Sequence, residues 1–152
     1  MNIPLYGGCL CGALRFECRS VPISAAFCHC RNCQKAHSAP YAAVALMPPG
    51  SIALLAGEPK RHEMIADSGA TMFREFCGQC GTPLFSGSER FPEFTGVKIV
   101  ALDDPAAISP VVHAWTENRI TWACIDDGLP RLVKQGDLAD AEQLWARRTD
   151  AG

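Results

Sequence analysis

The sequence predicts a mainly β fold with one short helix after its middle cysteines and one helix at the C-terminus. Three observations support this fold class. Short apolar or alternating runs are separated by Gly- and Pro-containing turns at short intervals, as in small β domains. Most cysteines fall in tight groups that could join distant strands. The segment 137–149 has helical periodicity instead.

Length and composition predict a single domain spanning residues 1–152. The chain has 152 residues, of which 48% are hydrophobic and 20% charged, enough to bury a core. The net charge of −2, with dispersed Lys and Arg, argues against nucleic-acid binding. No run of about eighteen apolar residues and no secretory leader pattern is present, so we expect no membrane association and a cytoplasmic location.

The predicted strands share β-branched, aromatic or alternating apolar composition between turn residues. They are residues 13–19, 24–27, 41–47, 51–56, 71–76, 83–86, 97–102, 111–115 and 120–124. The first is the clearest, because Leu14, Phe16 and Cys18 alternate with charged residues. The segments 41–47 and 51–56 flank Pro48-Pro49-Gly50, which predicts two strands joined by a turn.

Residues 31–38 predict the short helix, which should end before Pro40. Cys33 would lie near its start, where free backbone N–H groups and the helix dipole favour a thiolate. At the other end of the chain, Asp137 can cap a helix that ends near Arg148. One face of that helix carries Leu138, Ala141, Leu144 and Trp145. This face could cover the core of its own chain or form a homodimer contact.

Seven of the nine cysteines form three close groups: Cys9 with Cys11, Cys28 with Cys30 and Cys33, and Cys77 with Cys80. A disulfide across so short a loop is strained, whereas such neighbours can share one metal ion. A reducing cytosol would also keep the thiols free. The count divides into four ligands for one closed zinc site and three for a second zinc with an open position. We therefore expect two zinc ions per chain.

For the closed site we pair Cys9 and Cys11 with Cys77 and Cys80, because two Gly-flanked turns far apart in sequence can be linked by one structural ion. The alternative is four unrelated buried cysteines. The remaining Cys18 and Cys124 belong to no group and are expected to be small buried residues.

The middle group, Cys28, Cys30 and Cys33, has no fourth cysteine nearby and is the candidate catalytic site. Three thiolates make zinc a poor activator of water and suit a soft thiol substrate. Arg31 and Lys35 are the nearest cations in sequence. One alternative is that His29 or His37 completes a second structural site. A redox C-x-x-C is the other, but the third thiol and the missing βαβ pattern argue against it.

Four segments of the chain, 7–16, 28–33, 74–85 and 113–130, closely resemble the glutathione-dependent formaldehyde-activating (GFA) family, which includes the centromere protein V domain. The resemblance covers about residues 5–132, with all seven grouped cysteines in matching order. It implies a zinc-bound β-tent fold, a structural site at Cys9, Cys11, Cys77 and Cys80, and a catalytic site at Cys28, Cys30 and Cys33. The implied activity is that of a carbon-sulfur lyase, which reversibly adds glutathione to formaldehyde to give S-hydroxymethylglutathione.

The chain departs from the family at Gln34 and His37, where members often have arginine and a small residue, so its thiol substrate could differ from glutathione. Two other functions remain open. A non-catalytic, zinc-stabilised binding module is one alternative to a lyase. A redox protein like the methionine sulfoxide reductases is the other, but it would need an unligated reactive cysteine, and only Cys18 and Cys124 qualify.

Overall fold

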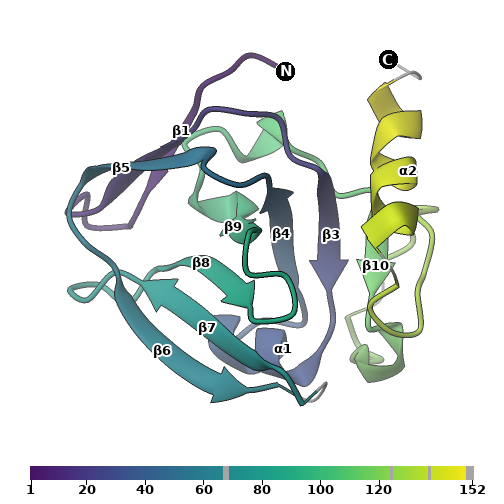
Figure 1. Ribbon diagram of the computed structural model, residues 1–152. Coiled ribbons are helices and arrows are strands. Elements are labelled where there is room, and N and C mark those ends of the chain that lie inside the picture. Colours follow the sequence, from purple (N-terminus) through teal and green to yellow (C-terminus); the bar gives the residue numbers. More distant parts are fainter. Residues whose placement is uncertain (67–68, 124, 137, 150–152) are drawn as a thin grey trace.

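The computed structural model describes residues 1–66, 69–123, 125–136 and 138–149. Two β-sheets and two α-helices form the described chain, and its fold is mainly β as predicted (Figure 1). No helix among the described residues is both long and apolar enough to cross a membrane. Cys124 and Asp137, which carried two of the predictions, lie outside the described residues.

The smaller sheet is antiparallel, with strand order β1-β2-β5. Its strands are β1 (Leu5–Gly8), β2 (Arg15–Cys18) and β5 (Ile52–Ala56). Strand β2 confirms the alternation in the sequence, because Leu14, Phe16 and Cys18 are buried while Arg15 and Glu17 are half-exposed. Burial also raises the pKa of the Cys18 thiol to about 11, so this cysteine is inert.

The larger sheet has the order β10-β3-β4-β9-β8-β7-β6. Its strands are β3 (Ser24–Cys28), β4 (Ala42–Met47), β6 (Lys60–Ile65), β7 (Thr71–Phe76), β8 (Pro83–Ser88), β9 (Thr95–Lys98) and β10 (Val112–Ala114). All neighbours are antiparallel except β10 and β3, which run parallel with Ala114 opposite Cys28. This pairing brings the late part of the chain beside the middle cysteines.

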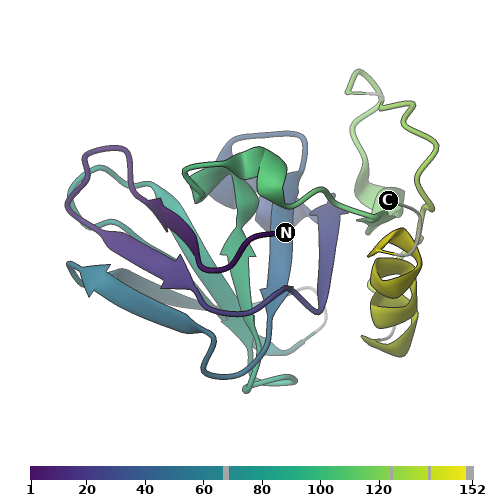
Figure 2. The same ribbon diagram turned by 90° about the horizontal axis from the view of Figure 1, so that it is seen from above.

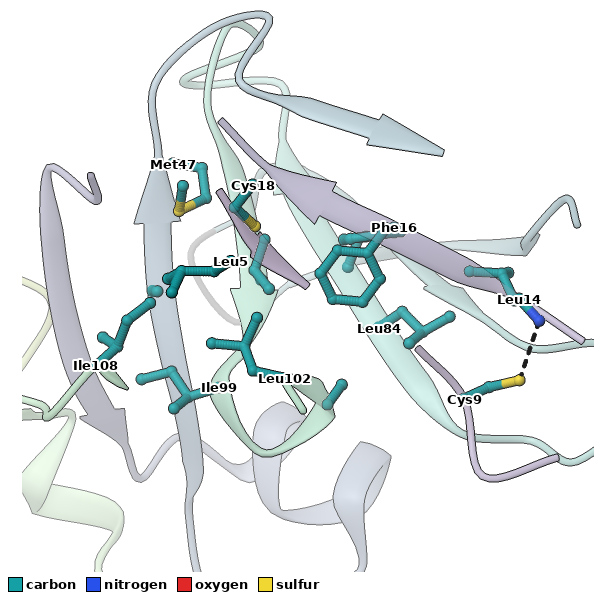
Figure 3. Close-up of a cluster of buried hydrophobic side chains, with 14 of the residues drawn as sticks. Leu5, Cys9, Leu14, Phe16, Cys18, Met47, Leu84, Ile99, Leu102 and Ile108 are labelled. Carbon is teal, nitrogen blue, oxygen red and sulfur yellow. Dashed lines mark hydrogen bonds between the residues drawn. The ribbon is translucent and has the colours of Figure 1, made fainter. Parts of the chain in front are cut away.

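The hydrophobic core lies between the two sheets, as the close-up in Figure 3 shows. The Phe16 ring of β2 meets the Phe85 ring of β8 edge to face, with 4.9 Å between their centroids. Leu84 is completely buried beside them. Cys9 and Cys77 belong to this same cluster, so the first and third cysteine groups both border the core.

Two α-helices contact strands of the larger sheet, α1 at β4 and α2 at β3. Helix α1 (Arg31–His37) follows β3 as predicted and ends at Ser38, which adopts a left-handed conformation. Helix α2 (Leu138–Thr149) runs beside β3 and β10 (Figures 1 and 2), and Trp145 packs against the core. Three short 3-10 turns complete the regular structure: η1 (Ile99–Ala101), η2 (Pro105–Ala107) and η3 (Thr116–Asn118).

The structure corrects several predicted strands. The apolar run 97–102 is not one strand, because β9 ends at Lys98 and the chain turns into η1. Residues 120–123 form a turn in which Trp122 is 76% exposed, since one edge of β10 pairs with β3 and the other edge is bonded to residues 130–132. Strands β4 and β5 are separated by the predicted turn but belong to different sheets. The exposed edge strand β6 was missed because its sequence is mostly polar.

Candidate metal centres

The first centre joins two turns from opposite sides of the core. Cys9 and Cys11 lie between β1 and β2, and Cys77 and Cys80 lie between β7 and β8. Their four sulfur atoms all lie within 4.8 Å of one another. The Cys11 sulfur is 3.5 Å from that of Cys9 and 3.8 Å from that of Cys77. A tetrahedral zinc ion with bonds of about 2.3 Å sets its sulfurs about 3.8 Å apart, so these distances fit that ion.

Hydrogen bonds to the sulfurs prepare this first centre for a metal. The backbone N–H of Leu14 donates to the Cys9 sulfur over 3.2 Å (Figure 3). Cys80 lies 3.1 Å from the Thr82 hydroxyl, which lowers the pKa of the Cys80 thiol to about 5. Such contacts favour thiolates, the form in which cysteine binds metal.

The second centre lies where β3 ends and α1 begins. Cys28 is the last residue of β3, Cys30 caps α1 and Cys33 lies in its first turn. Their three sulfurs also lie within 4.8 Å of one another. The Cys33 backbone N–H donates to the Cys30 sulfur over 3.3 Å, so the helix start faces Cys30 and not, as expected from the sequence, Cys33.

A thiolate at this second centre is favoured at Cys33 for a different reason. Hydrogen bonds from the Cys28 and Cys30 thiols hold the pKa of Cys33 far below its usual range, and the charges of Lys98 and Arg74 lower it further. The same contacts raise the pKa of Cys28. Without a metal, negative charge in this group is therefore favoured at Cys33. A divalent cation that binds thiolates fits this donor set.

Lys98 and Arg74 are site residues that sequence reasoning missed. Lys98, at the end of β9, is 2% exposed and donates to the Ser86 hydroxyl over 2.7 Å. Burial lowers its pKa to about 8. The Arg74 guanidinium, from β7, lies 3.8 Å from the Cys33 sulfur. The sequence did carry a signal for Lys98, because it lies inside the apolar run 97–102. A lysine is almost never fully buried unless its charge is paired.

Arg31, one of the two cations nearest to the three cysteines in sequence, pairs with a side chain of its own helix, α1. It donates a hydrogen bond to the Gln34 side chain, whereas the cation that contacts Cys33 is Arg74. Gln34, one of the two departures from the family, is 4% exposed and donates to the backbone carbonyls of His29 and Asn118 over 2.8 and 2.9 Å. These two hydrogen bonds join α1 to the backbone at His29 and at Asn118.

Neither histidine near the second centre joins its ligand set. Among the described residues, only the three sulfurs lie within 4.8 Å of one another, with no His29 or His37 nitrogen in the group. Burial lowers the pKa of His37 to about 4, so its ring is neutral at pH 7. The His37 Nε2 and Arg74 Nε atoms are buried and have no hydrogen-bond partner within the described chain. Buried polar atoms are nearly always paired, so these two atoms keep hydrogen-bonding capacity that a polar ligand could use.

Comparison with known proteins adds three findings. The sequence profile described as "glutathione-dependent formaldehyde-activating enzyme" matches residues 4–118. A Colletotrichum graminicola protein, provisionally named as such an enzyme, is 28% identical over 101 residues, which are 60% of this chain and 52% of that protein. The chain thus spans about half the length of this curated relative. A crystal structure of a Rhodobacter sphaeroides protein has the same fold, with a TM-score of 0.58 and 21% identity over 72% of this chain and 100% of that one.

Proposed function

Because this chain belongs to the glutathione-dependent formaldehyde-activating family, we propose that it is a zinc-dependent carbon-sulfur lyase acting on the adduct of a small thiol with an aldehyde. One observation carries the proposal. The sulfurs of Cys28, Cys30 and Cys33 lie within 4.8 Å of one another, and no fourth protein ligand joins them among the described residues. A site with three protein ligands leaves a position for substrate, as in catalytic zinc sites.

The four-cysteine centre has a structural role in this proposal. Cys9, Cys11, Cys77 and Cys80 would hold a zinc ion in a closed set that joins the turn before β2 to the turn before β8. Its binding free energy would add to the stability of the fold.

Cys28, Cys30 and Cys33 would hold the catalytic zinc ion. When bound there, zinc would supply an open position for the sulfur of a substrate thiol and favour loss of its proton. The residues around the sulfurs set the charge of this site. Three cysteine thiolates and one substrate thiolate carry more negative charge than the ion, and the buried Lys98 and the half-buried Arg74 offset part of it.

The reaction itself is a reversible addition. The thiol gives up its proton, its sulfur forms a bond to the aldehyde carbon, and the carbonyl electron pair moves onto oxygen, which takes up a proton. The reverse reaction breaks the same carbon-sulfur bond. Lys98 and Arg74 stabilise negative charge near Cys33, and the unpaired Nε atom of Arg74 is a donor available to a polar substrate atom. The family name supports glutathione and formaldehyde as the first substrates to test.

The test follows exchange of ¹³C-labelled formaldehyde between its free form and S-hydroxymethylglutathione by NMR, with zinc per chain measured on the same sample. We expect the wild-type protein to accelerate this exchange over the spontaneous rate. Cys30→Ser should abolish the acceleration, although serine preserves the helix cap. The matched variant Cys80→Ser, in the other centre, should lose stability but keep catalysis in the folded fraction. No acceleration by folded, zinc-loaded wild-type protein would instead support the non-catalytic binding module.

A further inference from the structure

A chain of three hydrogen-bonded side chains runs from the protein surface to His29, the residue between Cys28 and Cys30 in the sequence. The ring atoms His29 Nε2 and His113 Nδ1 are 2.9 Å apart. On the other side of the same ring, His113 Nε2 lies 3.1 and 3.0 Å from the two carboxylate oxygens of Asp127. His29 and His113 are 4% and 2% exposed, whereas the Asp127 side chain is 27% exposed.

We propose that Asp127 and His113 are positioning residues that orient His29 and thereby hold Cys28 and Cys30 in place to bind metal. The inference rests on the metal site of the proposed function, but not on the lyase reaction. Asp127 lies beyond the residues that match the family profile, 4–118. The three-residue chain therefore links the second centre to the late segment 113–130, which resembles the family in sequence.

The carboxylate sets the direction of the hydrogen bonds. An ionised carboxylate only accepts, so the His113 Nε2 atom carries a hydrogen and donates to Asp127. In a neutral ring this leaves His113 Nδ1 as an acceptor, and the His29 Nε2–H donates to it. The backbone N–H of Leu129 donates to Asp127 over 3.1 Å, which fixes the carboxylate. One orientation of Asp127 thus determines the tautomers of both rings.

His29 is held at three points as a result. Its backbone N–H donates to the Ala114 carbonyl over 2.9 Å, and its own carbonyl accepts from Gln34 over 2.8 Å. Its ring is the third point, through His113. Because His29 stands between Cys28 and Cys30 in the chain, fixing its backbone and its ring limits the positions that the two neighbouring sulfurs can adopt.

The same geometry argues against His29 as a metal ligand. Its Nε2 atom is occupied by His113, and neither ring nitrogen falls in the group of ligand atoms around the three sulfurs. Aromatic rings enclose the pair: Phe27 stacks on His113 with 5.1 Å between centroids, and Tyr41 lies 5.3 Å from His29. A buried, enclosed polar chain of this kind is stable only when each member keeps its partner.

The experiment measures Cd²⁺ binding to the metal-free full-length protein, by competition with a chelator, and assigns the two centres by ¹¹³Cd NMR. Two variants alter the chain of hydrogen bonds. His113→Phe removes both bonds and keeps a ring against Phe27, and the milder Asp127→Asn changes one half-exposed group. Tyr41→Leu is the matched control, because it removes a ring beside His29 and leaves every hydrogen bond of the three-residue chain in place.

We expect both variants to weaken Cd²⁺ binding at the three-cysteine centre by about 10–100-fold, the usual effect of groups that orient metal ligands. The four-cysteine centre of the same molecule should keep its affinity, and so should both centres of Tyr41→Leu. In the wild type, ¹⁵N NMR should find the hydrogen on His113 Nε2. In Asp127→Asn, the ¹⁵N signals of the His29 ring should differ from those of the wild type. Unchanged affinity in folded Asp127→Asn, an equal loss at both centres, or an equal loss in Tyr41→Leu would each overturn the proposal. Lack of lyase activity would leave this result unaffected.

Discussion

Replacing Gly57 by alanine should destabilise the protein and disturb the four-cysteine centre. Gly57 follows β5 with a φ of +71°, in the left-handed region that L side chains rarely adopt. A Cβ atom there would lie 2.3 Å from the Ala13 carbonyl oxygen, where real Cβ atoms keep at least 3.0 Å. The atom in the way belongs to the backbone, so the clash cannot be relieved by rotating a side chain.

Two costs make up the expected loss of stability. The left-handed conformation costs alanine about 1–2 kcal/mol, and forcing an extra carbon into an occupied position adds roughly 1–3 kcal/mol. The sum is about 2–5 kcal/mol, or a fall in Tm of about 5–15 °C for a chain of this size. The displaced residues also serve the first centre, because Leu14 follows Ala13 and donates to the Cys9 sulfur over 3.2 Å.

The matched control is Gly50→Ala, in the turn between β4 and β5. Gly50 has a φ of +68°, but no atom lies within 4 Å of the position that an alanine Cβ would take, so only the conformational cost of about 1–2 kcal/mol applies. Thermal and urea unfolding of metal-loaded samples would compare the two variants, and zinc release to a chelator would follow the centre. Equal destabilisation by both variants would refute the steric part of the reasoning.

Three further predictions concern the site, the core and the surface. Lys98→Met removes a buried cation that lowers the pKa of Cys33, so the pKa of Cys33 in the metal-free protein, followed by thiolate absorbance against pH, should rise; an unchanged pKa would contradict this. Leu84→Ala deletes a completely buried side chain and should cost about 2–5 kcal/mol in urea unfolding. The Arg15 guanidinium lowers the pKa of Asp103 below its ordinary 3.8, so this pair stabilises the fold above that pH and loses its contribution as the pH falls through the lowered value. Because the Asp103 side chain is 50% exposed, Asp103→Asn should cost less than about 1 kcal/mol at pH 7, and wild type and variant should unfold alike in strong acid.

The amino-acid pattern was sufficient for the parts of the protein that depend on near neighbours. The alternation around Phe16 predicted β2, and the helix after Cys30 was expected from the residues before Pro40. The spacing of the cysteines likewise predicted which thiols share a turn, because two or three residues can only span one turn. These features follow from backbone periodicity and from chain geometry over a few residues.

Other features depended on strand pairing, which a single sequence does not encode locally. The edge strand β6 has a polar sequence and exists because β7 offers it hydrogen bonds, whereas residues 120–123 resemble a strand and have no partner in the described chain. The same limit explains why the sequence pointed to Arg31 as a cation near the sulfurs and not to Arg74.

At the second centre, the sequence indicated the metal-binding sulfurs and the fold determined which other groups surround them. The cysteine pattern alone indicated three sulfurs without a fourth, and thus the kind of ion that fits. Only the tertiary structure placed Lys98 and Arg74 beside Cys33 and joined His29 to His113 and Asp127. The positions of Lys98, Arg74 and His113 follow from the pairing of β8 with β7 and β9 and of β10 with β3. Burial and charge are properties of what surrounds a residue, and those surroundings are assembled from segments tens of residues apart.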